Sequence, residues 1–123
     1  MRPDDGGTGA HEVTVTCTRD GVAARIAVVG ELTDTARRPL VRIVTDLLLA
    51  EQSLRRLQLD LRGVTFMGSA GLAVLVQLQK MVQPRGIELA LAVEDVAVTR
   101  PLQLSGLWHR FTVIDRREGP AAT

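Results

Sequence analysis

The hydrophobic pattern of this chain switches between two periods, and the switch limits its fold more than any other sequence feature. Apolar residues alternate with other residues at 57–61 and again at 87–93, as they do in β-strands. Before each of these runs, apolar residues recur every three or four positions, as on one face of a helix. The helical positions are Leu40, Ile43, Val44, Leu47 and Leu48 in one segment, and Leu72, Leu75, Val76, Gln79 and Val82 in the other. Strands that alternate with helices need crossover connections, so we expect parallel pairing with helices packed on the sheet.

The chain opens with a predicted β-hairpin. Val13, Val15 and Cys17 alternate with threonines, Asp20-Gly21 is a turn signal, and residues 22–29 are rich in valine and isoleucine. The alternation groups Cys17 with the valines, so we expect a buried, unreactive thiol. With a short third helix and a final strand at 111–114, the order becomes β-β-α-β-α-β-α-β. The sequence therefore predicts a single α/β domain with a mixed β-sheet and three to four packed helices.

Proline and serine mark where the helices are expected to begin. Pro39 suits the first turn of the first helix, where a missing N–H costs least. Residues 63–68 are predicted to form a connecting loop, and Ser69 is predicted to be the N-cap of the second helix. Because Pro101 also lacks an N–H, we expect the third helix to begin late, with Thr99 as its N-cap.

Length and composition favour a small soluble domain. The 123 residues fit one domain, expected at 11–116 between disordered tails at 1–10 and 117–123. The net charge is +1 and the basic residues are scattered along the sequence, so we expect no nucleic-acid partner. No apolar run approaches the roughly 18 residues of a membrane span, and the N-terminus has no hydrophobic signal core. We therefore expect a cytoplasmic protein without membrane insertion.

No group of residues has the spacing of a catalytic, metal or cofactor site. His11 and His109 stand far apart, with no other ligand type at metal-binding spacing. Asp60 has no second acid–base group beside it, so we expect its carboxylate to bond backbone or solvent. Ser69 lies outside any nucleophile elbow, and the glycines are too loosely spaced for a dinucleotide loop. We expect no enzyme and no cofactor.

The segment around Ser69 is the part of the sequence that suggests a function. A strand, a loop and a helix beginning at Ser69 would place its hydroxyl at the rim of the sheet, beside the positive end of a helix dipole. A phosphoryl group there would add a charge of about −1.5 to −2 and three acceptor oxygens. The helix would tolerate this charge, whereas a partner packed over the helix end would not unless it supplied a cation. Both an N-cap and a regulatory site fit this position.

Three segments resemble one protein family. Residues 59–76, LDLRGVTFMGSAGLAVLV, resemble the signature of STAS domains, the fold of bacterial anti-sigma factor antagonists. Residues 30–32, Gly-Glu-Leu, resemble the segment that follows the second strand in this family. Residues 104–107, Leu-Ser-Gly-Leu, resemble the segment that closes the third helix. The three segments stand in the family's order, and the resemblance covers residues 12–116.

The resemblance implies a regulator that works by binding partners and not by catalysis. In such antagonists the first serine of the Asp-Ser-Ser/Ala-Gly motif is phosphorylated by a kinase of the histidine-kinase-like ATPase fold, which is also the anti-sigma factor. The unphosphorylated antagonist binds this kinase and frees the sigma factor, and a PP2C-type phosphatase resets the cycle. The matching position here is Ser69. The implied partner-binding residues are Glu31, Thr33, Asp34, Met67, Gly68, Ser69, Ala70, Leu72 and Ala73.

Three positions depart from the family pattern. Gly68 stands where the family usually has Asp, and Thr33 replaces another usual Asp, with Asp34 one place later. Loss of the acidic neighbour of Ser69 favours a rival function, a constitutive STAS adaptor subunit of a lipid-transport ABC-type complex without a phosphorylation cycle. Trp108 stands where a polar residue is more usual. It either covers the edge of the core or contacts a partner.

Overall fold

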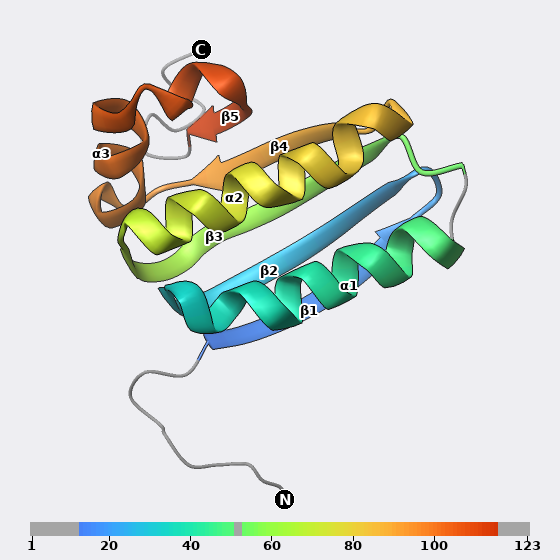
Figure 1. Ribbon diagram of the computed structural model, residues 1–123, viewed down its shortest axis with the longest axis horizontal. Helices are drawn as coiled ribbons and strands as arrows, with labels where there is room; N and C mark the ends of the chain where they lie inside the picture. Colours follow the sequence, from blue (N-terminus) through green and yellow to red (C-terminus); the bar gives the residue numbers. More distant parts are fainter. Residues whose placement is uncertain (1–12, 51–52, 116–123) are drawn as a thin grey trace, which may run out of the picture.

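The computed structural model describes residues 13–50 and 53–115 (Figure 1). The tails predicted at 1–10 and 117–123 lie outside the described residues, as do the predicted domain limits at 11 and 116. Within the described residues the elements follow one another as predicted, β-β-α-β-α-β-α-β, with short 3-10 helices between them. The helices are α1 (Arg37–Ala50), α2 (Ser69–Val82) and α3 (Val96–Ser105), with η2 (Asp34–Ala36), η3 (Gln83–Arg85) and η4 (Leu107–Arg110).

The sheet has five strands in the order β1-β2-β3-β4-β5, which is also their order along the chain. The first two strands pair antiparallel around a tight turn at Gly21, whose φ of 64° suits glycine. The remaining neighbours pair in parallel, so the predicted mixed sheet is confirmed. The strands are β1 (Val13–Asp20), β2 (Ala23–Leu32), β3 (Arg56–Met67), β4 (Glu88–Val93) and β5 (Thr112–Asp115).

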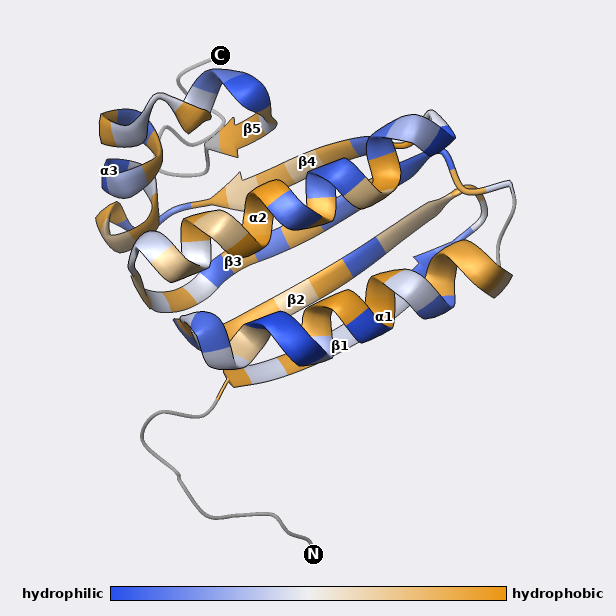
Figure 2. Ribbon diagram, viewed as in Figure 1, coloured by the Kyte–Doolittle hydropathy of each residue, from blue (hydrophilic) through white to orange (hydrophobic). Residues whose placement is uncertain are grey.

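Helices α1 and α2 lie side by side over one face of the sheet, and α3 packs beside the end of β3 (Figure 1). In Figure 2 hydrophobic and hydrophilic stretches alternate along α1 and α2, as they do in amphipathic helices. The core between the helices and the sheet is almost entirely aliphatic. Each leucine that is fully buried contributes about 1.5–3 kcal/mol. The largest fully buried side chains of this core include Ile26, Leu32, Leu40, Leu57, Leu59, Leu61, Leu75, Leu78 and Leu91.

The loop predicted at 63–68 is wrong, because β3 continues to Met67. Beyond Gly63 the strand pairs with the end of β2, where Gly30 lies opposite Val64. Two register shifts interrupt this pairing, so the side chains lose the simple alternation on which the prediction relied. A Cβ at position 63 would lie 2.9 Å from the Val29 Cγ2 atom, so a glycine at this position allows the two strands to approach.

The buried environment predicted for Cys17 is also wrong, because its side chain is exposed. Cys17 pairs with the fully buried Ile26, so the alternation assigned it to the correct face of the sheet. It lies on the edge strand, in a shallow pocket whose other walls include Ile43 and Leu47 of α1. Partial burial raises the pKa of the Cys17 thiol, and the charge of Arg19 opposes that rise. The raised pKa keeps the thiol in its less reactive protonated form.

Helix α3 begins earlier than the sequence predicted. Its N-cap is Asp95, whose Oδ1 accepts a hydrogen bond of 2.8 Å from the Ala97 N–H, so Thr99 is not the cap. Thr99 instead lies inside the helix and is fully buried, and Pro101 follows in the helix interior. The Asp95 carboxylate caps the helix at this earlier position. Pro101 does not prevent the early start, because it removes only the hydrogen bond to the Ala97 carbonyl.

Candidate functional site

The candidate site lies where β2 and β3 end side by side and α2 begins (Figure 1). In the register of this parallel pair, Glu31 lies opposite Phe66 and Leu32 lies opposite Met67. The segment after Leu32 therefore runs beside the segment after Met67. This arrangement brings together two parts of the predicted partner surface that are more than thirty residues apart in sequence.

The absence of a side chain at Gly71 allows the first turn of α2 to lie close to the end of β2. A Cβ at this position would overlap the backbone carbonyl oxygen of Leu32 and lie 2.8 Å from the Met67 Cγ atom. Gly71 is buried, so no open space exists into which a side chain could turn. Because glycine lacks the Cβ, the helix can approach this closely, and the approach fixes where Ser69 lies relative to the end of β2.

Ser69 is the first residue of α2 and not its N-cap, so the predicted capping role is wrong. The N-cap is Gly68, in an extended conformation, and its carbonyl accepts a hydrogen bond of 3.1 Å from the Leu72 N–H. Within the described chain no side chain caps this helix. The helix begins at Ser69, as predicted, but its first carbonyl acceptor belongs to Gly68. The exposed Ser69 side chain thus has no capping function to perform.

The structure places the other predicted partner-binding residues around Ser69 at different depths. Met67 is 3% exposed, so its side chain belongs to the core and supports the site from beneath. The side chains of Asp34 and Ala73 are exposed. The residues of intermediate exposure are Glu31, Thr33, Gly68, Ala70 and Leu72.

The charged side chains of the predicted partner surface are those of Glu31 and Asp34. Helix α2 contains no acidic residue, so the partial positive charge at its N-terminus is not offset by a carboxylate in its own first turn. The carboxylate of Asp34 accepts a hydrogen bond of 3.0 Å from the Arg37 Nε atom. Both side chains of this ion pair are substantially exposed, so it adds little to stability. The surface around the hydroxyl therefore consists mainly of small residues, with the carboxylates of Glu31 and Asp34 and the one arginine that is paired with Asp34.

An apolar groove beside the site was missed by the sequence reasoning. Phe66, Val96 and Leu104 are 50%, 55% and 77% exposed, and all three line a groove of about 450 Å³ that also includes Pro101. The groove adjoins Gly68, because a Cβ there would lie 3.4 Å from the Phe66 ring. The sequence signal was Phe66 itself, a rare aromatic residue in this chain, but its segment was assigned to a loop. Exposed apolar surface of this kind is typical of protein–protein contacts.

The structure favours one of the two roles that the sequence left open for Trp108. Its side chain has intermediate exposure and packs against the hydrophobic core from η4. Its position therefore supports the role of covering the edge of the core. Trp108 is not fully exposed, as a residue dedicated to partner contact would be.

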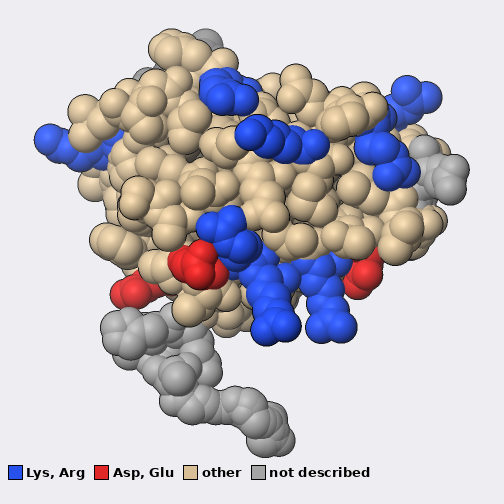
Figure 3. Space-filling model, in the orientation of Figure 1, with Lys and Arg blue, Asp and Glu red and all other residues tan. Residues whose placement is uncertain are grey.

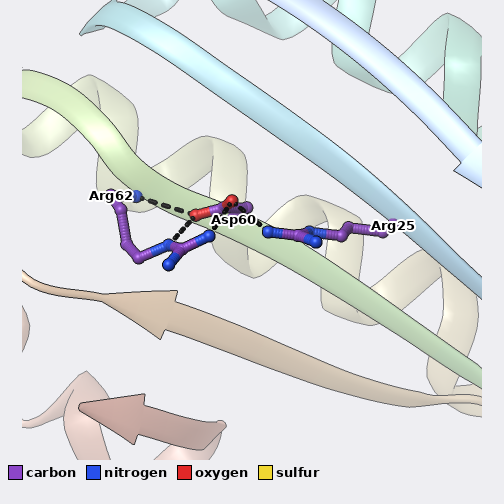
Figure 4. A network of polar contacts seen from close by, with 3 residues as sticks. All are labelled: Arg25, Asp60 and Arg62. Atoms are coloured by element: carbon purple, nitrogen blue, oxygen red, sulfur yellow. Dashed lines mark hydrogen bonds and ion pairs between the residues drawn. The ribbon is translucent and has the colours of Figure 1, made fainter. Parts of the chain in front are cut away.

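Asp60 takes part in an ion-pair network that the sequence reasoning did not predict (Figure 4). Its Oδ2 accepts hydrogen bonds of 2.6 Å from Arg25 on β2 and 2.9 Å from Arg62, and its Oδ1 accepts 2.8 Å and 3.1 Å bonds from the Arg62 Nε and backbone N–H. The expectation of backbone or solvent bonds was therefore incomplete.

These contacts determine the chemistry of the Asp60 carboxylate. The hydrogen bonds from Arg62 hold the pKa of Asp60 well below its usual range, burial opposes the shift, and Arg25 adds to it. The hydrogen bond and charge of Asp60 in turn raise the pKa of Arg62. A carboxylate with so low a pKa is a poor general base, so the network ties β2 to β3 and does not suit acid–base catalysis.

The described residues hold no arrangement suited to a metal ion. Among 13–50 and 53–115, no three His, Cys, Asp or Glu side chains come together as ligands. His109 is exposed in η4, and His11 lies outside the described residues. In the same part of the chain, none of the helices combines the length and hydropathy required to cross a membrane.

Comparisons with known proteins agree with this fold. A model of the STAS domain family matches residues 14–119. A comparison with curated proteins found no match. Among solved structures, an anti-sigma factor antagonist from Mycobacterium paratuberculosis is similar with a TM-score of 0.72 and 22% identity, over 87% of this chain and 89% of that chain.

Two further structures are of one protein in two states. The anti-sigma factor antagonist SpoIIAA in its unphosphorylated form has a TM-score of 0.70 at 18% identity, over 88% of this chain and 92% of that chain. The Bacillus cell fate determinant SpoIIAA in its phosphorylated form has a TM-score of 0.66 at 16% identity, over 88% and 96%. At these identities the structures establish the fold, and the family model establishes the family.

Proposed function

Because this chain belongs to the STAS-domain family, we propose that it is an anti-sigma factor antagonist that works by binding a serine kinase. The kinase has the histidine-kinase-like ATPase fold and is itself the anti-sigma factor, so binding releases the sigma factor. The observation that carries the proposal is the exposed hydroxyl of Ser69 at the first residue of α2. Its position in the sequence matches the phosphoacceptor of the antagonists that the chain resembles.

Phosphorylation of Ser69 would switch this binding off. The kinase transfers the γ-phosphoryl group of ATP to the Ser69 Oγ, ADP leaves, and the hydroxyl proton passes to a base of the kinase. The helix N-terminus tolerates the added charge of about −1.5 to −2. A partner packed over Ser69 must instead desolvate this charge at the centre of the contact, which weakens binding. A PP2C-type phosphatase restores the binding form by hydrolysis.

The proposed partner surface surrounds Ser69. Gly68, Ala70 and Ala73 are small, so a partner can approach the backbone of α2 closely. The apolar groove at Phe66 extends this surface on one side and offers area for hydrophobic contact. The proposed surface comprises Glu31, Thr33, Asp34, Gly68, Ser69, Ala70, Leu72 and Ala73, with Met67 supporting it from the core.

The test begins with capture of the partner. The full chain is used as bait in a lysate of the native cell, and bound proteins are identified by mass spectrometry. The captured kinase is then purified and incubated with the chain and ATP. We expect one phosphate per chain by intact mass, and much weaker binding of the kinase by the modified protein.

Two matched variants locate the modified group. Ser69→Ala should abolish phosphate incorporation. Thr65→Ala removes another exposed hydroxyl of the same region and should leave incorporation intact. Phosphate on Ser69→Ala, or equal binding of the kinase by both forms of the chain, would contradict the switch.

Gly68 favours a second candidate function, a constitutive STAS adaptor subunit of a lipid-transport ABC-type complex. The antagonists that the chain resembles usually have Asp beside the acceptor serine, and this chain does not. Gly68→Asp separates the candidates. Faster phosphorylation of this variant supports the antagonist. If it remains unphosphorylated while the unmodified chain captures a permease and an ATPase, the adaptor is the better account.

A further inference from the structure

The outer surface of the helical layer carries an excess of positive charge. Helix α1 contributes Arg37, Arg38 and Arg42 against the single acid Asp46, and α2 contributes Lys80 and no acid. Figure 3 shows this surface: Lys and Arg side chains gather at its lower edge, over α1, with few acidic groups between them. The net charge of the chain is only +1, so the overall composition does not reveal this local excess.

A groove of about 790 Å³ lies within this charged area, between the beginning of α1 and the middle of α2. Arg37, Arg38 and Arg42 line it, with Val41 on α1 and Gln77 on α2. Asp34 lies at the same groove and is the one acidic group among the described residues that line it. The groove therefore combines three guanidinium groups with a small apolar surface and an amide.

The arginines of this groove differ in how firmly they are held. Arg37 donates a 2.5 Å hydrogen bond to the Gln77 Oε1 atom and a 3.0 Å bond to Asp34, so it forms a fixed wall. Gln77 accepts through its oxygen, and an amide nitrogen at this place is of the type that donates to a peptide carbonyl. Arg38 and Arg42 are exposed and stand four residues apart, on the same side of the helix.

We propose that this groove binds an acidic segment of a protein partner. Guanidinium groups form paired hydrogen bonds with carboxylates, and Val41 and Gln77 suit the aliphatic and amide parts of a peptide. A single-stranded nucleic acid would be expected to stack on aromatic rings, and the described lining has none. A membrane surface would need large exposed apolar side chains beside the cations, and the described groove lining has none. The inference goes beyond the proposed function and does not depend on phosphorylation of Ser69.

The test uses the full chain and a fluorescein-labelled octaglutamate peptide, with binding followed by fluorescence anisotropy at low ionic strength. We expect octaglutamate to bind and the affinity to fall as salt is added, because the contact is exposed. The double variant Arg38→Glu and Arg42→Glu should weaken binding about tenfold or more. The matched control is the double variant Arg100→Glu and Arg110→Glu, which makes the same change in net charge at exposed positions on α3 and η4 and should bind as the wild type does. Circular dichroism establishes that both variants are folded.

Three results would overturn the inference. One is the absence of octaglutamate binding at low salt. Another is equal weakening by the two double variants, which would mean that binding follows net charge and not the groove. The last is tighter binding of duplex DNA or of phosphatidylserine vesicles than of octaglutamate, with the same sensitivity to the Arg38 and Arg42 changes. That result would assign the groove to a different class of partner.

Discussion

Gly71, on the first turn of α2, lies directly against the backbone carbonyl oxygen of Leu32 at the end of β2. An added Cβ would overlap this backbone atom, which cannot move aside as a flexible side chain could. We expect Gly71→Ala to lower the free energy of unfolding by about 1–3 kcal/mol, although alanine is the better helix former. Denaturant titration measures the change. Ala73→Gly, the reverse substitution at an exposed position of the same helix, should cost about 1 kcal/mol through helix propensity alone. If Gly71→Ala is as stable as the wild type, the close approach is not what positions Ser69.

Gly68 is the N-cap of α2, and its extended conformation is open to any residue. Aspartate at an N-cap accepts hydrogen bonds from the first turn and favours the positive end of the helix dipole. Gly68→Asp should therefore raise the free energy of unfolding by a few tenths to about 1 kcal/mol. Gly68→Ala should lower it, because alanine is a poorer N-cap than glycine and, like glycine, supplies no side-chain acceptor. Equal stabilities of these two variants would show that the cap has no part in the effect.

Ser69 makes no capping bond, so its hydroxyl should contribute little to stability. We expect Ser69→Ala to change the free energy of unfolding by less than about 0.5 kcal/mol. Thermal unfolding of both proteins provides the comparison. A loss of 1 kcal/mol or more would mean that the hydroxyl stabilises the helix after all. An unchanged stability makes this variant a clean probe of phosphorylation.

The low pKa of Asp60 links stability to pH. The unfolded chain takes up a proton on this carboxyl near pH 4, whereas the folded chain resists protonation. The stabilisation from Asp60 is therefore present above pH 4 and is lost as the pH falls further. Asp60→Asn should lower stability by about 1–3 kcal/mol at neutral pH and reduce its decline below pH 4. Denaturant midpoints from pH 7 to pH 3 test this. Parallel curves for the two proteins would exclude Asp60 as the source of the acid sensitivity.

Thr99 buries a hydroxyl that finds no hydrogen-bond partner among the described residues. Burial of such a group costs free energy, and valine has nearly the same shape without the polar atom. We expect Thr99→Val to raise the free energy of unfolding by about 1 kcal/mol. Thr99→Ser keeps the hydroxyl, loses a buried methyl group, and should be less stable than the wild type. Should Thr99→Val be the less stable variant, the hydroxyl has a partner in solution.

The order of the elements was predictable because hydrophobic period is a local property. Leu57, Leu59 and Leu61 are all fully buried in β3, and the helical positions Leu40, Val44 and Leu75 are fully buried as well. The strand order of the mixed sheet follows from short crossover connections. The segment around Ser69 could be assigned to the start of a helix, since the change from a strand period to a helical period is also local.

The N-caps of α2 and α3 were misplaced by a few residues, and the other errors arose where a non-local partner decided the outcome. Pairing with the end of β2 turned the expected loop after Gly63 into strand, and the edge position of β1 left Cys17 exposed although its face was correct. Asp60 acquired Arg25 as a partner from 35 residues away, which no local pattern could indicate.

The sequence by itself determined the α/β fold class, the run of strands and helices, and the segment that carries Ser69, because each depends on local spacing and on short motifs. Only the tertiary structure decided which residues meet. In the folded chain Gly71 contacts the backbone of Leu32, and the ends of β2 and β3 lie side by side. The arginines of α1 line a groove together with Gln77 of α2. Packing brings together residues that are distant along the chain, and their distances, burial and charge exist only once the chain is folded.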